Sequence, residues 1–218
     1  MSTKKLLGIY NAMDRYFGDL QWWPAKEPFE VIVGAILTQN TNWKNVERAI
    51  QNLREEGYLV PEKLRRARVE RLETLIRPSG YYRVKARRLK KYIEFFFREY
   101  GGRIERMFAE DWRMLRAELL KVNGIGEETA DSILLYAGYK PVFVVDQYTR
   151  RIFSRHGLID GNENYEYIQR YITDRLPADV SLYNQYHALI VNTGKQFCRK
   201  DPLCGECPLR RISGKKIS

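Results

Sequence analysis

This sequence of 218 residues has few cysteines, few histidines and no long apolar run. Its three cysteines all fall within residues 198–207, unlike the spread, even-numbered framework of a disulfide-rich secreted protein. No apolar stretch approaches the roughly 20 residues that a membrane helix needs, and the first residues lack the apolar core of a secretory leader. We therefore expect a soluble protein of the cytoplasm that does not insert into a membrane.

Positive charge is the main excess in the composition. There are 38 Lys and Arg against 27 Asp and Glu, which gives a formal net charge of +11 and a pI near 9.5. Neutralising the charges of a polyanion releases its counterions, so nucleic acid is the first candidate partner and an anionic membrane surface the second. With 44% hydrophobic residues, the chain can bury a core in one domain or two small ones.

Apolar residues recur at spacings of three and four along most of the chain, as at Leu6, Ile9 and Met13. This periodicity predicts a nearly all-α protein of about nine or ten short helices. Residues 29–37 are apolar on almost every side, which predicts a central helix that the others bury. Residues 142–145 form an isolated β-like run, which we interpret as an extended, buried connector.

A helical hairpin is predicted around two glycines. One helix ends at Val122 and a second begins near Glu127, with Gly124 and Gly126 on either side of Ile125. Glycine lets the backbone turn tightly and approach a ligand, and the free N–H groups at a helix start attract anions. The pattern indicates either a grip on a nucleic-acid phosphate or an ordinary helix connection with a glycine cap.

An aspartate at the end of the apolar run 142–145 adds to this pattern. Asp146 lies twenty residues after the hairpin, and Gly138 and Pro141 stand between them. Together these features resemble the helix–hairpin–helix, Gly/Pro and Asp pattern of the DNA glycosylase superfamily, and the chain resembles endonuclease III. Residues 36–43 and 80–86 are similar to that family's polar loop and its Gly-x-x-x-x-Lys-Ala element.

The resemblance implies two helical domains that flank a DNA-binding cleft. A six-helix barrel is expected over residues 27–138, with the helix–hairpin–helix motif at about 113–138. Residues 1–26 and 139–218 are expected to form a discontinuous second helical domain that ends in the cysteine-rich loop.

The resemblance also implies that Asp146 is the catalytic carboxylate. Cleavage of an N-glycosidic bond leaves an oxocarbenium-like sugar, and a fixed carboxylate in a dry site stabilises that cation and orients or deprotonates the attacking water. The alternative is that Asp146 caps a helix that starts at Gln147, because Asp is a favourable N-cap residue. One residue can fill both roles.

One departure from the family pattern concerns the reaction type. Bifunctional relatives carry a lysine nucleophile in the second hairpin helix, where this chain has Glu128. A carboxylate cannot form an imine, so we predict a monofunctional glycosylase that leaves an intact abasic strand. Two alternatives stay open, an amine supplied by Lys121 or Lys195. Glu128 is either a second acid/base group lining the base pocket or a solvated residue in the first helical turn.

The pocket for an extruded base needs aromatic walls, for which Trp22, Trp23 and Trp43 are candidates. The alternative is that these tryptophans are core residues. A tryptophan-rich pocket suits a positively charged base, because cation–π attraction contributes roughly 0.5–2 kcal/mol. The chain is most similar to the branch that removes alkylated purines such as 3-methyladenine, the 3-methyladenine glycosylase III branch. There a lysine of the last helix lines the pocket, and Lys195 matches it.

Two polar stretches are candidates for DNA contact. Residues 77–91 contain seven Lys or Arg residues and no acid, which indicates either phosphate contact or a solvated helix face. In the polar loop, two amide side chains either fill the gap that the extruded base leaves or cap the helix end. The residues expected to contact DNA are Gln39, Asn40, Lys85, Arg87, Asn123, Gly124, Ile125 and Gly126.

The cysteines resemble the loop in which endonuclease III relatives hold a [4Fe–4S] cluster. Here Cys198, Cys204 and Cys207 have a first gap one residue shorter than in the family, and Ser213 stands at the fourth ligand position. Serine is a poor substitute for a thiolate. A cluster, no metal at all and zinc therefore remain alternatives for this loop.

These observations predict a monofunctional DNA glycosylase of base excision repair. Its expected partner is double-stranded DNA with a damaged base, on which it acts as a monomer at the nucleoid. Two alternatives stay open: a bifunctional glycosylase and AP lyase that acts on oxidised pyrimidines, and a non-catalytic helix–hairpin–helix protein that binds DNA.

Overall fold

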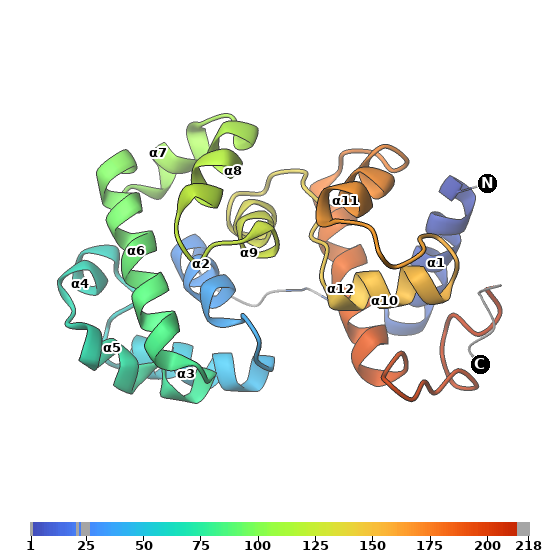
Figure 1. Cartoon of the computed structure of the whole chain (residues 1–218), viewed down its shortest axis with the longest axis horizontal. Helices are drawn as coiled ribbons and strands as arrows, with labels where there is room; N and C mark the ends of the chain where they lie inside the picture. Colours follow the sequence, from blue (N-terminus) through green and yellow to red (C-terminus); the bar gives the residue numbers. More distant parts are fainter. Residues whose placement is uncertain (1, 21, 23–26, 213–218) are drawn as a thin grey trace. The chain divides into compact units, whose positions relative to one another are not determined.

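The computed structural model describes residues 2–20, 22 and 27–212 (Figure 1). These residues form twelve α-helices, a 3₁₀ turn and a π-helical segment, without any β-strand, so the predicted all-α fold is confirmed. The sequence pattern missed two or three helices because α4, α5 and α7 have only six or seven residues each. A helix of two turns is too short to show a full apolar repeat. No helix in this described part is long and apolar enough to cross a membrane.

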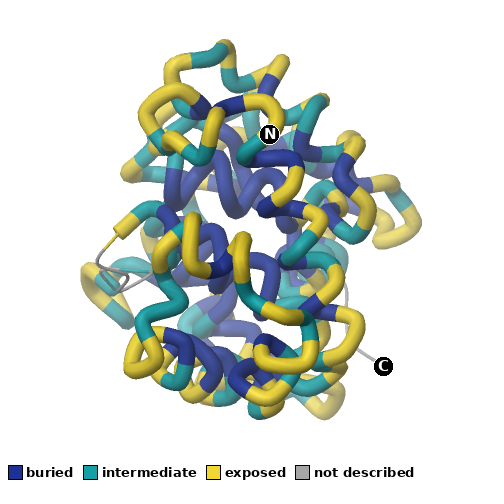
Figure 2. Tube along the Cα trace, turned by 90° about the vertical axis from the view of Figure 1, so that its left-hand side faces the viewer, coloured by how far each residue is buried: buried dark blue, intermediate teal, exposed yellow. Residues whose placement is uncertain are grey.

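The chain divides into two compact units, which we describe separately. The hairpin unit comprises residues 25–140, and the aspartate unit comprises residues 1–24 together with residues 141–218. Buried residues, dark blue in Figure 2, alternate with exposed ones along the helices, as expected for helices with one buried face.

The hairpin unit is organised around the helix α2 (Pro28–Leu37). Eight of the ten residues of α2 are buried, which confirms the central helix predicted over 29–37. Around α2 pack α3, α6, α9 and the π-helical segment η2. The other elements of this unit are α3 (Trp43–Glu55), α4 (Pro61–Arg66), α5 (Val69–Leu75), the 3₁₀ turn η1 (Arg77–Ser79), α6 (Tyr82–Tyr100), α7 (Ile104–Ala109), α8 (Trp112–Lys121), α9 (Glu127–Ser132) and η2 (Ile133–Ala137).

The aspartate unit is built on α12 (Val180–Gln196), which packs against α1 (Ser2–Phe17) and α10 (Gln147–Arg155). The fourth helix of this unit is α11 (Tyr165–Thr173).

An extended segment, residues 142–145, runs through the core of the aspartate unit, as the sequence predicted. Because no strand lies beside this segment in the described chain, side chains of α11 supply hydrogen bonds to its backbone. The N–H of Val145 donates to the Tyr165 hydroxyl at 3.2 Å, and Gln169 Nε2 donates to the Phe143 carbonyl at 2.7 Å. These bonds fix the backbone that leads directly into Asp146.

Candidate functional site

Asp146 is the N-cap residue of α10. Its backbone is extended, with φ −108° and ψ −176°. Its Oδ1 accepts two hydrogen bonds from Thr149, from the backbone N–H at 2.7 Å and from Oγ1 at 2.9 Å. The capping role that the sequence left open is therefore present, and it holds the carboxylate in a fixed orientation.

The second oxygen of Asp146 faces His187 of α12. His187 Nε2 lies 3.6 Å from Asp146 Oδ2, and the two side chains are 8% and 11% exposed. Burial raises the pKa of Asp146, but the hydrogen bond and charge of His187 and the two Thr149 donors act against it. The resulting pKa lies below the usual value for an aspartate. Asp146 is therefore a carboxylate at neutral pH, in spite of its burial.

His187 is not among the site residues that the sequence predicted. The signal that could have found it is its rarity, because the chain contains two histidines and a buried histidine in such a chain needs a polar partner. What could not be found from the sequence is which of the many acidic residues serves as that partner.

A close approach of α10 and α12 sets the position of His187 relative to Asp146. At Gly194 of α12, a Cβ atom would lie 2.2 Å from Cδ1 of Tyr148, so only glycine allows this contact. Arg151 lies over the Tyr148 ring, 5.1 Å from its centroid, and its Nη2 donates to the Gly194 carbonyl at 3.4 Å. The packing of two helices, and not a flexible loop, therefore determines the geometry of the site.

Of the residues predicted to line the base pocket, the structure brings Trp22 and Lys195 together. Lys195 Nζ lies 5.7 Å from the centroid of the Trp22 ring, within the range of a cation–π contact. The Trp22 Nε1 atom is buried and has no hydrogen-bond partner among the residues that the structure describes. Trp23 lies outside the described residues. Trp43, the first residue of α3, is half-buried, and Glu128 is exposed on α9; both belong to the hairpin unit.

The predicted hairpin is formed by α8, α9 and the turn between them. Gly124 has φ +96°, and a Cβ there would lie 2.3 Å from Cγ of Arg88. Gly126 differs, because its φ is −95° and no atom lies within 4 Å of the Cβ position. Gly124 is therefore required by the fold, whereas nothing in the fold requires a glycine at position 126.

The side chain of Ile125 does not face outward. It is 4% exposed and belongs to the core of the hairpin unit. The prediction that Ile125 contacts DNA is therefore corrected, because the turn buries this apolar side chain and the N–H of Ile125 donates to the Val122 carbonyl at 2.9 Å. Asn123 and Gly126, on either side, are exposed as the prediction requires.

Gln39 supports the turn from the inside. Its Nε2 donates to the Gly124 carbonyl at 3.0 Å and to Thr129 Oγ1 at 2.9 Å, and its Oε1 accepts from Arg88. Because the amide nitrogen and the amide oxygen of Gln39 are both hydrogen-bonded within the protein, this side chain is not available to fill a gap in DNA. The role predicted for Gln39 therefore does not fit this structure. Asn40 beside it is exposed and has a left-handed backbone with φ +53°. Such backbone strain in a residue other than glycine is often found at functional sites.

Lys85 is another correction to the predicted DNA contacts. It is 1% exposed, and its ammonium donates to the carbonyls of Leu37 at 2.9 Å and Ser79 at 2.6 Å. Burial, with a smaller effect from the charge of Arg88, lowers the pKa of Lys85 to about 8. Lys85 therefore joins the end of α2 to η1, because a cation there satisfies the last helical carbonyl. Arg87, two residues later, is exposed.

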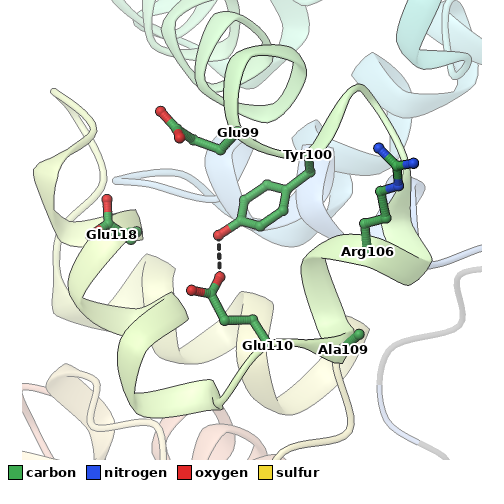
Figure 3. Close-up of a pocket in the computed structure, with 6 residues that line it drawn as sticks. All are labelled: Glu99, Tyr100, Arg106, Ala109, Glu110 and Glu118. Atoms are coloured by element: carbon green, nitrogen blue, oxygen red, sulfur yellow. Dashed lines mark hydrogen bonds between the residues drawn. The ribbon is translucent and has the colours of Figure 1, made fainter.

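A hollow in the hairpin unit lies between α6, α7 and α8 and is lined by three glutamates, one arginine, Tyr100 and Ala109 (Figure 3). Tyr100 donates its hydroxyl hydrogen to Glu110 Oε2 at 2.5 Å. Glu99 and Glu118 line the same hollow. Carboxylates repel phosphates, so this face of the hairpin unit is not suited to DNA.

The cysteine loop was tested for its fit to a [4Fe–4S] cluster. Cys198 and Cys207 are buried and Cys204 is exposed. Arg155 of α10 donates from Nη1 to Cys198 Sγ at 3.3 Å and also binds two loop carbonyls, at 2.6 and 3.2 Å. No three potential ligands in the described chain are arranged to hold a metal ion, and Ser213 lies outside that part. The described residues therefore do not fit the cluster, which needs four ligands.

Known proteins resemble this chain across both units. A family model, HhH-GPD superfamily base excision DNA repair protein, matches residues 33–178. A protein of Methanocaldococcus jannaschii, provisionally named a DNA repair glycosylase, is 50% identical over 94% of this chain and 93% of its own length. Endonuclease III of Thermotoga maritima is 33% identical over 84% of this chain and 81% of its own. The structure of an H. pylori 3-methyladenine DNA glycosylase bound to 1,N6-ethenoadenine has a TM-score of 0.77 and 28% identity, covering 89% of this chain and 97% of that chain.

Proposed function

Because this chain belongs to the HhH-GPD superfamily of base excision DNA repair proteins, a superfamily of DNA glycosylases, we propose that it acts as a monofunctional DNA glycosylase. Its proposed reaction is hydrolysis of the N-glycosidic bond of a damaged base in double-stranded DNA. The observation that carries the proposal is Asp146, a buried carboxylate that its partners keep ionised.

Asp146 supports this reaction through its charge. As the bond between C1′ of the sugar and the base nitrogen breaks, the electron pair leaves with the base and positive charge develops on the sugar. A carboxylate that is already oriented in a dry site stabilises this charge without reorganising. The oxygen of a water molecule then bonds to C1′, and the carboxylate accepts a proton from that water.

The absence of AP lyase activity is proposed from the hairpin. A lyase needs an amine that attacks C1′ and forms a Schiff base, and the position where bifunctional relatives carry that lysine holds Glu128. Of the two alternative lysines, Lys121 is paired with Glu118 at 2.6 Å, and Lys195 lies over the Trp22 ring. Neither lysine is an evident replacement for the missing amine.

DNA binding is proposed to use the exposed part of the hairpin turn. The N–H groups at the start of α9 have no acceptors within the helix, so they can bind a phosphate. Exposed Asn123 and Gly126 flank the turn, and exposed Asn40 and Arg87 are the chain neighbours of Gln39 and Arg88, whose side chains lie against Gly124.

The proposed substrate is an alkylated purine. Support comes from Trp22, whose ring already attracts one cation, and from the H. pylori relative, which is named for 3-methyladenine and was solved with an ethenoadenine base. A cationic base would have to displace the Lys195 ammonium from this ring, because like charges repel at this range. A neutral alkylated base could stack on the ring without this repulsion from the Lys195 ammonium.

A set of labelled duplexes, each with one lesion, tests the proposal. Release of a base by a monofunctional enzyme gives strand breaks only after alkali treatment, whereas a lyase gives them without alkali. Borohydride trapping of a covalent DNA complex would contradict the monofunctional reaction. Including both charged and neutral alkylpurines, alongside uracil and oxidised pyrimidines, tests the base class in the same experiment. A Lys195→Met variant should improve release of charged bases relative to neutral ones.

A further inference from the structure

We propose that His187 is a positioning residue that orients Asp146 and keeps it ionised during base release. This inference rests on the proposed function, in which Asp146 is the catalytic residue. The two residues meet at 3.6 Å between Nε2 and Oδ2, in a part of the aspartate unit where both side chains are about nine-tenths buried.

The two oxygens of Asp146 have different partners. Oδ1 accepts both Thr149 donors, which belong to the same helix, so these bonds survive any movement of α12. Oδ2 faces His187, which belongs to α12. His187 is therefore the residue through which the second helix fixes the plane of the carboxylate, leaving the remaining lone pairs of Oδ2 for water and sugar.

The chemistry gives His187 a second effect. Burial by itself favours the neutral form of a carboxylic acid. A hydrogen-bond donor near Oδ2 opposes this effect of burial by favouring the carboxylate, and a positively charged imidazolium opposes it more strongly. Without His187 the pKa of Asp146 is expected to rise, and a larger fraction of the enzyme would lose the negative charge as the pH falls.

Other ionisable groups near this pair would not explain a rise in the pKa of Asp146 on loss of His187. On α10, the pKa of Tyr148 is raised by burial and by the charge of Asp146, and Arg151 carries a permanent charge. On α1, the pKa of Tyr10 is raised by burial, and Asp14 binds Gln185 at 2.9 Å. Tyr165 of α11 is bound to the backbone of Val145. The two tyrosines on α1 and α10 therefore stay neutral in the acid range where Asp146 titrates.

The test compares base-release rates under single-turnover conditions as a function of pH. His187→Phe should lower the plateau rate at least about tenfold and move its acid limb upward by about one pH unit. His187→Gln, which keeps a hydrogen-bond donor, should return the acid limb most of the way to its position in the wild type. His156→Phe is the matched control, because it removes the other histidine of the aspartate unit, which contacts neither Asp146 nor Thr149 in the described structure. DNA affinity should be unchanged in all three variants.

Several outcomes would overturn the inference. Equal pH profiles for wild type, His187→Phe and His187→Gln would refute it and leave the proposed function intact. If His187→Phe does not fold, His187→Ala takes its place in the comparison, and a pH profile of His187→Ala equal to that of wild type would refute the inference. If the wild type releases no base from any duplex, the proposed function fails instead. The pairing is then still tested by NMR, where Asp146→Asn should shift the imidazole resonances of His187, and unchanged resonances would refute the pairing.

Discussion

Asp146 lies almost fully buried, with Thr149 donating to one oxygen and His187 3.6 Å from the other, whereas the hairpin turn carries exposed residues at Asn123 and Gly126. In the aspartate unit, direct hydrogen bonds from Thr149 thus hold the carboxylate that we propose as the catalytic group. In the hairpin unit the fixing groups, Gln39 and Arg88, lie beneath the turn, and the proposed binding groups are backbone amides above them. The proposed chemical site is therefore buried, whereas the proposed binding site is exposed.

This difference predicts which property each region controls. Changes at Asp146 and His187 should alter the rate of base release with little effect on DNA affinity, because neither group is exposed enough to bind a phosphate. Changes on the outer side of the hairpin should alter affinity and its salt dependence with little effect on the bound enzyme's rate. Changes beneath the hairpin should act first on stability.

The largest effect is expected at Asp146. Asp146→Asn keeps an N-cap side chain but removes the negative charge, so single-turnover base release should fall by roughly a thousandfold or more. Affinity for lesion-bearing duplex should stay within about twofold, as measured by fluorescence anisotropy. Thr149→Val, which removes one of the donors to Oδ1, is the milder companion variant. Base release that survives in Asp146→Asn would show that the chemistry lies elsewhere.

The next largest effect is expected beneath the hairpin, where Arg116 of α8 binds Asp131 of α9. Arg116 Nε and Nη2 donate to the two Asp131 oxygens at 2.6 and 3.1 Å, and Asp131 is fully buried. Arg116→Leu should cost about 3–5 kcal/mol of unfolding free energy, because it leaves a buried carboxylate without its cation. Chemical denaturation measures this loss. In the double variant with Asp131→Leu much of the loss should be recovered, and failure to recover it would show that the pair is not what joins the helices.

The two glycines of the turn form a matched pair for the same comparison. Gly124→Ala should destabilise the protein by roughly 2 kcal/mol, because its φ is +96° and its Cβ would overlap Arg88. Gly126→Ala should change stability by no more than about 0.5 kcal/mol but weaken DNA binding several-fold, since its Cβ would stand between the amides and a phosphate. If Gly126→Ala binds DNA as well as wild type does, the turn is not the phosphate site.

Two neighbouring cations on α6 give a smaller and more selective test. Arg87→Ala should lower the slope of log affinity against log salt by about one, whereas Lys85→Met should leave that slope unchanged. The pKa of Lys85 is lowered from 10.5 to about 8 in the folded state. Between these values the unfolded chain holds a proton that the folded chain has lost, so Lys85 makes the free energy of unfolding rise with pH. That rise should be absent from Lys85→Met in denaturation experiments at several pH values.

The sequence was most informative where a single type of residue indicates a structural feature. The apolar run of 29–37 predicted the central helix, and the two glycines with Asp146 pointed to the hairpin and the carboxylate. These features are local, and a pattern of neighbours in the chain is enough to reveal them. The family assignment rests on several such local patterns in the right order.

The sequence was least informative about which polar side chains face inward. Lys85 and Arg87 are two residues apart in one basic run, yet one is buried and the other exposed. Gln39 and His187 find partners 85 and 41 residues away along the chain, at Gly124 and Asp146. Such pairs depend on how helices pack, and packing is not encoded in the spacing of residues within one helix.

The smallest effect is expected at the cysteine loop, which belongs to the aspartate unit but makes none of the contacts of Asp146 described above. Arg155 holds this loop through Cys198 Sγ and two carbonyls, so the described part of the loop is held by protein hydrogen bonds. Protein purified without oxygen should therefore carry much less than the roughly four irons of a cluster, with no visible absorbance band, and a chelator should leave both the Tm and base release unchanged. Arg155→Ala should lower the Tm by only a few degrees, because two of the three hydrogen bonds that it removes are exposed and the three together contribute about 1 kcal/mol. Stoichiometric iron, with Arg155→Ala as stable as wild type, would mean that the cluster, and not the guanidinium, organises the loop.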